Sequence, residues 1–76
     1  MKDYSKSPEE KQFLKEMGKK IQIARKAKGI YLRDLAPLCN IHYSNLSMIE
    51  NGKYGSLILT LKTIAEKLDV DVKDFL

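Results

Sequence analysis

The amino-acid sequence predicts a small all-α domain of five helices, and three observations support this fold class. Apolar residues recur at three- and four-residue steps through most of the 76 residues, and helix start and stop signals divide the chain into segments. No alternating strand pattern, internal repeat or long linker interrupts those segments. We therefore expect a flexible end over residues 1–7 and one compact domain over residues 8–76.

The first helix is predicted to begin after Ser7, where the residue types of a capping box occur. Ser7 suits the N-cap, Pro8 the first helical position and Glu10 the third. An apolar stripe then continues at helical spacing through Leu14, Met17, Ile21 and Ala24. Gly29 ends this helix, because glycine commonly occupies the position that follows a helix.

Residues 32–53 predict two further helices joined by a tight turn. The first of them is expected over residues 31–39. It should be short or kinked, because Pro37 removes a backbone hydrogen bond and clashes with the preceding turn. Asn40 tolerates the left-handed conformation that a tight turn often demands, so the turn is placed there.

The helix after this turn is expected over residues 42–51, with Gly52 as its stop. Two short helices on a three- to four-residue turn are typical of a helix-turn-helix unit. Leu46 and Ile49 give the second helix a single buried stripe. Because its opposite face is left without a core partner, we interpret it as a DNA-recognition helix.

The last two elements are a fourth helix over residues 57–68 and a terminal turn over residues 71–76, capped by Asp71. Apolar residues without an obvious internal partner predict a dimer surface on these two elements. They are Leu59, Phe75 and Leu76.

The net charge of +4 is distributed unevenly along the chain. Residues 17–53 carry seven Lys and Arg against two acids, a net charge of +5, whereas residues 1–16 sum to zero and residues 54–76 to −1. A positive field over the helix-turn-helix and its preceding helix is what a phosphate-binding surface requires. The alternative interpretation is an ordinary solvated lysine-rich helix.

Several classes of function lack support in the sequence. One Cys and one His exclude a disulfide framework and are too few for a structural zinc site, so no cofactor is expected. Cys39 and His42 could suggest a thiol–imidazole nucleophile, but no acid lies nearby in sequence to orient the imidazole. No apolar run approaches a membrane span. We expect a soluble cytoplasmic protein that is not an enzyme and has no membrane partner.

From Met17 to Leu76 the chain resembles the lambda-repressor-like, Xre-type helix-turn-helix family. The matching segments are MGKKIQIARKAKGI, DLA, CNI, SNLSMIENGK and LTLKTIAEKLDV, of which IENGK after a helix-turn-helix is the most specific. The resemblance implies a five-helix domain that binds duplex DNA, often as a two-fold dimer, with the third helix in the major groove. It also implies a salt bridge between Arg25 and Glu50, which ties the first helix to the end of the third.

The residues expected to read bases lie on the outward face of the third helix. They are Tyr43, Ser44, Ser47 and Met48, and the first of them lie near the helix N-terminus, which enters the groove first in this motif class. Tyr43 and Met48 offer apolar surface to a thymine methyl group. The alternative is that these two side chains only cover an exposed edge of the core.

Phosphate contacts are expected on both sides of the recognition helix. Where the family usually has a Ser-Gln pair at the second helix, this chain has Tyr31-Leu32, and Leu32 cannot make the phosphate contact of that Gln. The side chains proposed for phosphate contact are Tyr31, Arg33, Asn51, Lys53 and Tyr54, together with the backbone of residues 51–55.

These observations predict a sequence-specific double-stranded-DNA-binding transcriptional regulator that acts as a repressor or autoregulator and as a homodimer. The alternative is an antitoxin or another protein-interaction module, whose main partner is a second protein such as a toxin.

Overall fold

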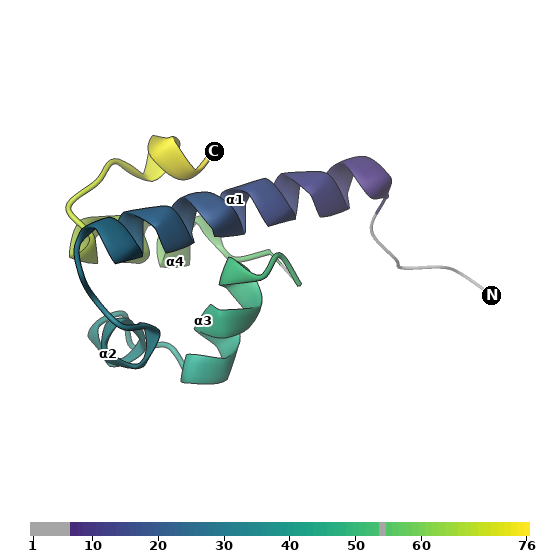
Figure 1. Ribbon diagram of the computed structural model, residues 1–76. Coiled ribbons are helices and arrows are strands. Elements are labelled where there is room, and N and C mark those ends of the chain that lie inside the picture. The colour runs from purple at the N-terminus through teal and green to yellow at the C-terminus, as the bar shows by residue number, and fades with distance from the viewer. Residues whose placement is uncertain (1–6, 54) are drawn as a thin grey trace.

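The computed structural model describes residues 7–53 and 55–76, and all of its regular structure there is helical. The elements are α1 (Pro8–Ala27), α2 (Leu32–Leu38), α3 (Tyr43–Glu50), α4 (Ile58–Lys67) and the 3-10 helix η1 (Val72–Phe75). The described residues therefore contain four α-helices rather than the five expected helices, because the last element is a single 3-10 turn. α1 has α2 and α3 on one side and η1 on the other (Figure 1).

The start of α1 is the predicted capping box. The Ser7 hydroxyl accepts a hydrogen bond from the Glu10 backbone N–H at 3.1 Å, and the Glu10 carboxylate accepts one from the Ser7 N–H at 2.8 Å. Ser7 therefore belongs to the helix cap, whereas the rest of the expected flexible end lies outside the described residues. α1 ends at Ala27, and Gly29, two residues later, has a φ of 74°.

Local sequence signals also determine the geometry of the helix-turn-helix. α2 is only seven residues long and contains Pro37, as the sequence predicts. Asn40 has a φ of 57°, and the next residue, Ile41, donates its N–H to the Ala36 carbonyl at 3.0 Å. Because Ala36 is small and buried, the turn closes directly against α2.

The core lies between α1 and the other helices. Its most deeply buried large side chains are Phe75, Ile21, Leu35, Leu46 and Ile64. The placement of Phe75 corrects the expectation that it belongs to a dimer surface: η1 packs against α1 and α4, and only 1% of Phe75 is exposed. Leu59 and Leu76, the other two residues of that expectation, are exposed.

α4 is one residue shorter at each end than expected, with Leu57 and Leu68 as its caps. Although Leu57 and Ile58 match the helical spacing of the core stripe, both are exposed, because the chain enters α4 from the surface. No helix among the described residues is long and apolar enough to cross a membrane.

Candidate nucleic-acid interface

The position of α3 is fixed by a close backbone approach to α1. A Cβ atom at Gly18 would overlap the backbone carbonyl oxygens of Ile49 and Glu50. The end of α3 is held in the same way, because a Cβ at Gly52 would lie 2.7 Å from the Cα of Lys15, and Gly52 itself has a φ of 69°. Glycine at these two positions lets α1 lie directly against the last turn of α3.

A buried ion pair ties the same turn of α3 to α1. Arg25 Nε and Nη2 donate to the two carboxylate oxygens of Glu50 at 2.7 and 3.1 Å, and both side chains are at most 10% exposed. The remaining nitrogen, Nη1, donates to the Ile30 carbonyl at 2.8 Å. A bidentate pair of this kind fixes geometry as well as charge. It also neutralises Glu50, the one acidic residue of α3.

The opposite face of α3 is turned to solvent, and we call it the recognition face: Tyr43, Ser44, Ser47 and Met48. Tyr43 and Met48 are 56% and 42% exposed, Ser44 is exposed and Ser47 is half-buried. The Ser47 carbonyl and hydroxyl oxygens accept hydrogen bonds from the Asn51 amide nitrogen at 2.8 and 3.4 Å. The face therefore combines two large apolar side chains with two short hydroxyls.

Arg33 and Tyr31 lie at the start of α2, the helix that packs against α3. The guanidinium carbon of Arg33 lies 4.9 Å from the centre of the Tyr31 ring, within the range of a cation–π contact. Both residues are exposed. Stacking limits the positions that the Arg33 side chain can take, while its N–H groups still face solvent.

The segment after α3 differs from the sequence-based expectation. The backbone N–H groups of Asn51, Gly52 and Lys53 donate to the carbonyls of Ser47, Ile49 and Met48 at 2.9–3.1 Å. These three N–H groups therefore close the end of α3 instead of facing a phosphate. The Asn51 amide also donates to the Ser47 carbonyl, while Asn51 and Lys53 are both exposed, and Tyr54 lies outside the described residues.

The lysines of α1 and of its C-cap lie on two sides of the molecule. Lys28 forms an ion pair with Asp69, and Lys20 Nζ lies 3.4 Å from the Leu76 carbonyl, so both contact the C-terminal segment. Lys15, in contrast, lies against Gly52, the residue that precedes Lys53 in the chain. Sequence analysis did not select Lys15, because its place depends on the contact between α1 and the end of α3.

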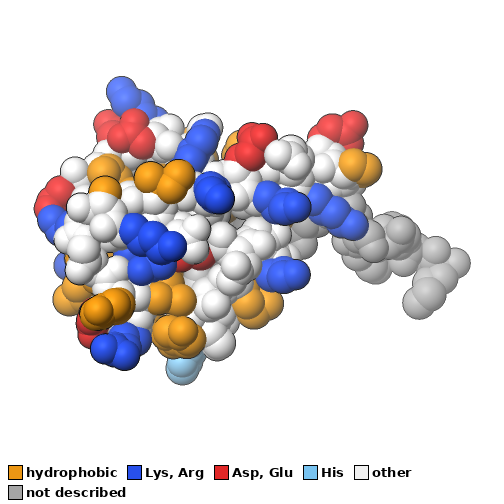
Figure 2. Space-filling model, viewed as in Figure 1, with side chains coloured by type: hydrophobic (Ala, Val, Ile, Leu, Met, Phe, Trp, Pro, Cys, Tyr) orange, Lys and Arg blue, Asp and Glu red, His pale blue; other side chains and the backbone are white. Residues whose placement is uncertain are grey.

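Hydrophobic side chains are interspersed with Lys and Arg over the end of the molecule that holds α2 and α3 (Figure 2). An open hollow of about 640 Å³ lies beside α3, lined by residues of the turn, α3 and the start of α4. Among the residues that line it are Asn45, Leu57 and Thr60. Asn45, the one amide within α3, thus lies at the flank of the helix rather than at the centre of the recognition face.

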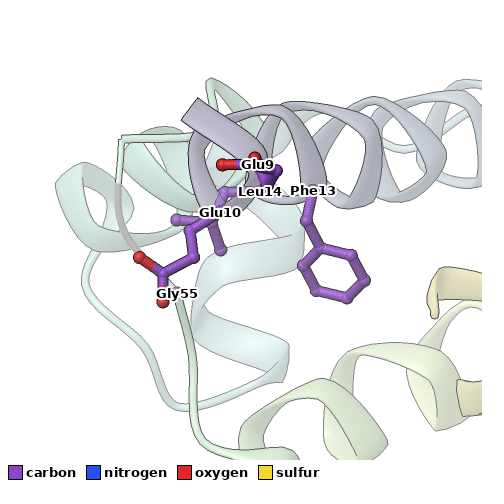
Figure 3. A pocket seen from close by; sticks show the side chains of 5 residues that line it. All are labelled: Glu9, Glu10, Phe13, Leu14 and Gly55. Carbon is purple, nitrogen blue, oxygen red and sulfur yellow. The ribbon is translucent and has the colours of Figure 1, made fainter. Parts of the chain in front are cut away.

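A second hollow, of about 440 Å³, lies at the start of α1 and contains none of the side chains predicted for the site. Glu10 and Phe13 project from the first turns of α1 beside Glu9, Leu14 and Gly55 (Figure 3). Its two carboxylates repel phosphate, so we do not include it in the candidate interface.

The environment of Cys39 opposes a role as a nucleophile. Burial raises the pKa of the Cys39 thiol above its ordinary value, and the nearby positive charge of Lys67 counteracts this only in part. The thiol therefore stays protonated at neutral pH, whereas nucleophilic cysteines need a lowered pKa. Among the described residues, no three His, Cys, Asp or Glu side chains cluster as metal ligands would.

Comparison with known proteins places the chain among helix-turn-helix domains. The family model HTH_3, described as helix-turn-helix, matches residues 21–75. The restriction-modification controller protein C.AhdI from Aeromonas hydrophila superimposes with a TM-score of 0.79 at 24% identity, covering 83% of this chain and 96% of that one. That likeness concerns the fold alone.

Two further solved structures are similar at higher identity. The clp gene regulator ClgR from Corynebacterium glutamicum has a TM-score of 0.80 at 25% identity, with 83% of this chain and 67% of that one covered. A chain of the SinR protein/SinI protein complex has a TM-score of 0.74 at 36% identity, with 79% and 59% covered. Comparison with curated protein sequences finds no match.

Proposed function

Because this chain belongs to the HTH_3 helix-turn-helix family, we propose that it is a sequence-specific double-stranded-DNA-binding transcriptional regulator, acting as a repressor or autoregulator. The observation that carries the proposal is the construction of α3. Its inner face is fixed to α1 by the Arg25–Glu50 pair, and its outer face is exposed. Arg33 at the start of α2 and Lys53 after the end of α3 add exposed positive charges. We infer that this outer face enters the major groove.

The proposed roles follow the geometry of the surface. The recognition face contacts base edges, while Tyr31, Arg33 and Lys53 contact phosphates and position the domain without reading sequence. Lys15 joins the phosphate-binding set because it lies against Gly52, the residue before Lys53. Tyr54 keeps its proposed phosphate role from the sequence. Asn51 is proposed to act indirectly, by holding the Ser47 end of α3.

The proposal includes a homodimer on a palindromic site and a cytoplasmic location, where the DNA is accessible. Two-fold symmetry would place the two recognition helices about 34 Å apart, one turn of B-DNA. Exposed Leu59 and Leu76 support a dimer surface on α4 and the C-terminal end. Size-exclusion chromatography at micromolar concentration, with and without DNA, tests this part, and a monomer under both conditions would contradict it.

The main test is selection of a random duplex library with the purified chain at about 100 mM salt, because phosphate binding depends on salt. We expect an enriched motif of two inverted half-sites. The control is the variant with Tyr43→Ala, Ser44→Ala and Lys53→Ala. If the chain enriches nothing beyond this control, the proposed function is wrong.

A second test separates positioning from reading. Arg33→Ala and Lys53→Ala should weaken binding to every duplex alike and reduce the salt dependence by roughly one unit of slope per lost phosphate contact. Lys15→Ala should do the same. Lys73→Ala, on η1 at the other side of α1, is the matched control and should change neither quantity.

One observation favours a second candidate function, an antitoxin or other module whose main partner is a protein such as a toxin. Leu57, Ile58 and Leu59 are consecutive and 76%, 56% and 71% exposed, a run that monomeric proteins seldom leave uncovered. SinR, a similar chain, is found in a complex with a second protein. Loss of partner capture in a Leu57→Ser, Leu59→Ser variant that still binds DNA would favour this function.

A further inference from the structure

We infer that the recognition face detects the C5-methyl group of pyrimidines, so that binding responds to cytosine methylation as well as to thymine. The inference rests on the proposed function, since it names the chemical group that the same surface recognises. Arg, Lys, Asn and Gln are the side chains that read guanine or adenine through paired hydrogen bonds. Of these, the eight residues of α3 contain only Asn45, which lines the hollow beside α4.

The hydrogen-bonding groups that α3 does have are short or already engaged. The Ser47 hydroxyl oxygen accepts from the Asn51 amide, and Asn45 lies at the flank of the helix beside α4. Ser44 is exposed, but its hydroxyl is compatible with several bases. The centre of the recognition face therefore has few hydrogen-bonding groups that could distinguish one base from another.

Apolar surface is what the face offers in quantity. Tyr43 and Met48 are its two largest side chains, and neither is covered by the core. Their surroundings are suited to DNA rather than to an apolar protein partner, because Arg33 on α2 and Lys53 after α3 are both exposed and Arg25 neutralises Glu50. This charge complementarity identifies the occupant as a polyanion with apolar groups in its groove.

The major groove of DNA presents one apolar group at the base edges, the C5-methyl of thymine. 5-Methylcytosine carries the same methyl at the same ring position, whereas uracil and cytosine lack it. A methyl group that leaves water against Tyr43 or Met48 should strengthen binding about fourfold, equal to about 0.8 kcal/mol. Methylation of one cytosine at such a position should therefore raise affinity by the same factor.

The test uses the duplex enriched by the library selection and the full chain. Each thymine is replaced in turn by deoxyuridine, which keeps the base pair and removes only the methyl. We expect about a fourfold rise in Kd at one or two thymines per half-site. At those positions a 5-methylcytosine–guanine pair should bind about fourfold more tightly than a cytosine–guanine pair.

Protein variants assign the effect to the recognition face. Met48→Ala or Tyr43→Ala should abolish the difference between thymine and deoxyuridine at one position, and Met48→Leu should retain it. Ile23→Ala is the matched control, because Ile23 is 57% exposed on α1, close to the 56% of Tyr43. This control should show the full methyl effect.

The outcomes separate the inference from the proposed function. An enriched motif whose deoxyuridine duplexes all bind within twofold of the original would overturn the inference and leave the function standing. A methyl effect that survives both alanine variants would assign it to DNA shape and also overturn the inference. Failure to enrich any motif would overturn the proposed function, and the inference with it.

Discussion

The two faces of α3 are built from opposite kinds of chemistry. The inner face holds Leu46 and Ile49 in the core and Glu50 in a bidentate pair with Arg25, and none of these residues is more than 8% exposed. The outer face is exposed and touches little of the rest of the chain. Position is thus determined by one set of residues and the proposed recognition by another, so we expect stability and DNA preference to respond to different substitutions.

The largest effect expected on the inner face comes from Glu50→Ala. Removing the carboxylate leaves the Arg25 guanidinium buried without its counter-charge, which should lower the free energy of unfolding by about 3–5 kcal/mol. Urea denaturation followed by circular dichroism measures it. Glu66→Ala, an exposed acid on α4, is the control and should stay within about 0.5 kcal/mol. A loss of less than about 1 kcal/mol for Glu50→Ala would contradict the account of the pair.

A second substitution that should destabilise the packing of the inner face is Gly18→Ala. The added Cβ overlaps the carbonyl oxygens of Ile49 and Glu50, so α1 and α3 must separate, at a cost of about 1–3 kcal/mol. The control is Gly55→Ala, whose Cβ would meet only the Leu14 Cδ2 methyl, at 3.3 Å. Alanine favours a helix interior by up to about 1 kcal/mol over glycine, so a stabilised Gly18→Ala variant would show that the close approach is absent.

The third prediction concerns the pH dependence of the buried side. Because burial raises the pKa of Cys39, the folded chain holds the thiol proton more tightly than the unfolded chain does. This contribution to stability is complete below the ordinary thiol pKa and is lost as pH rises through the thiol range. Above about pH 8.5 the wild type should lose stability more steeply than Cys39→Ala, by at most about 1.4 kcal/mol per pH unit. Parallel slopes would contradict the assignment.

What the sequence predicted well was determined by local geometry. The capping box of Ser7 and Glu10 and the left-handed Asn40 depend on residues that are neighbours in the chain. The spacing of Leu46 and Ile49 was enough to identify the buried face of α3, because a helix of known pitch leaves few alternatives. Local signals of this kind need no knowledge of the rest of the fold.

What the sequence could not predict depends on contacts between distant segments. Phe75 is buried because the chain reverses at Asp69, which has a φ of 59°, and brings η1 back against α1. Lys15 joins the candidate interface only because Gly52 lies against it. The Asn51 amide, predicted to contact a phosphate, also donates a hydrogen bond to the Ser47 carbonyl of its own helix. An apolar, charged or amide side chain near a helix end could contact several different segments of the fold. The spacing of residues in the sequence does not show which of these segments it contacts.

The smallest effect on stability is expected for substitutions on the outer face, in contrast to those on the inner face. Tyr43→Ala and Met48→Ala remove exposed side chains that support no core contact, so each should change the free energy of unfolding by no more than about 0.5 kcal/mol. The same variants should change which duplexes are enriched by the library selection. Urea denaturation and selection on one protein preparation measure both. A loss above about 2 kcal/mol would mean that these residues cover the core edge, and recognition would then need another surface.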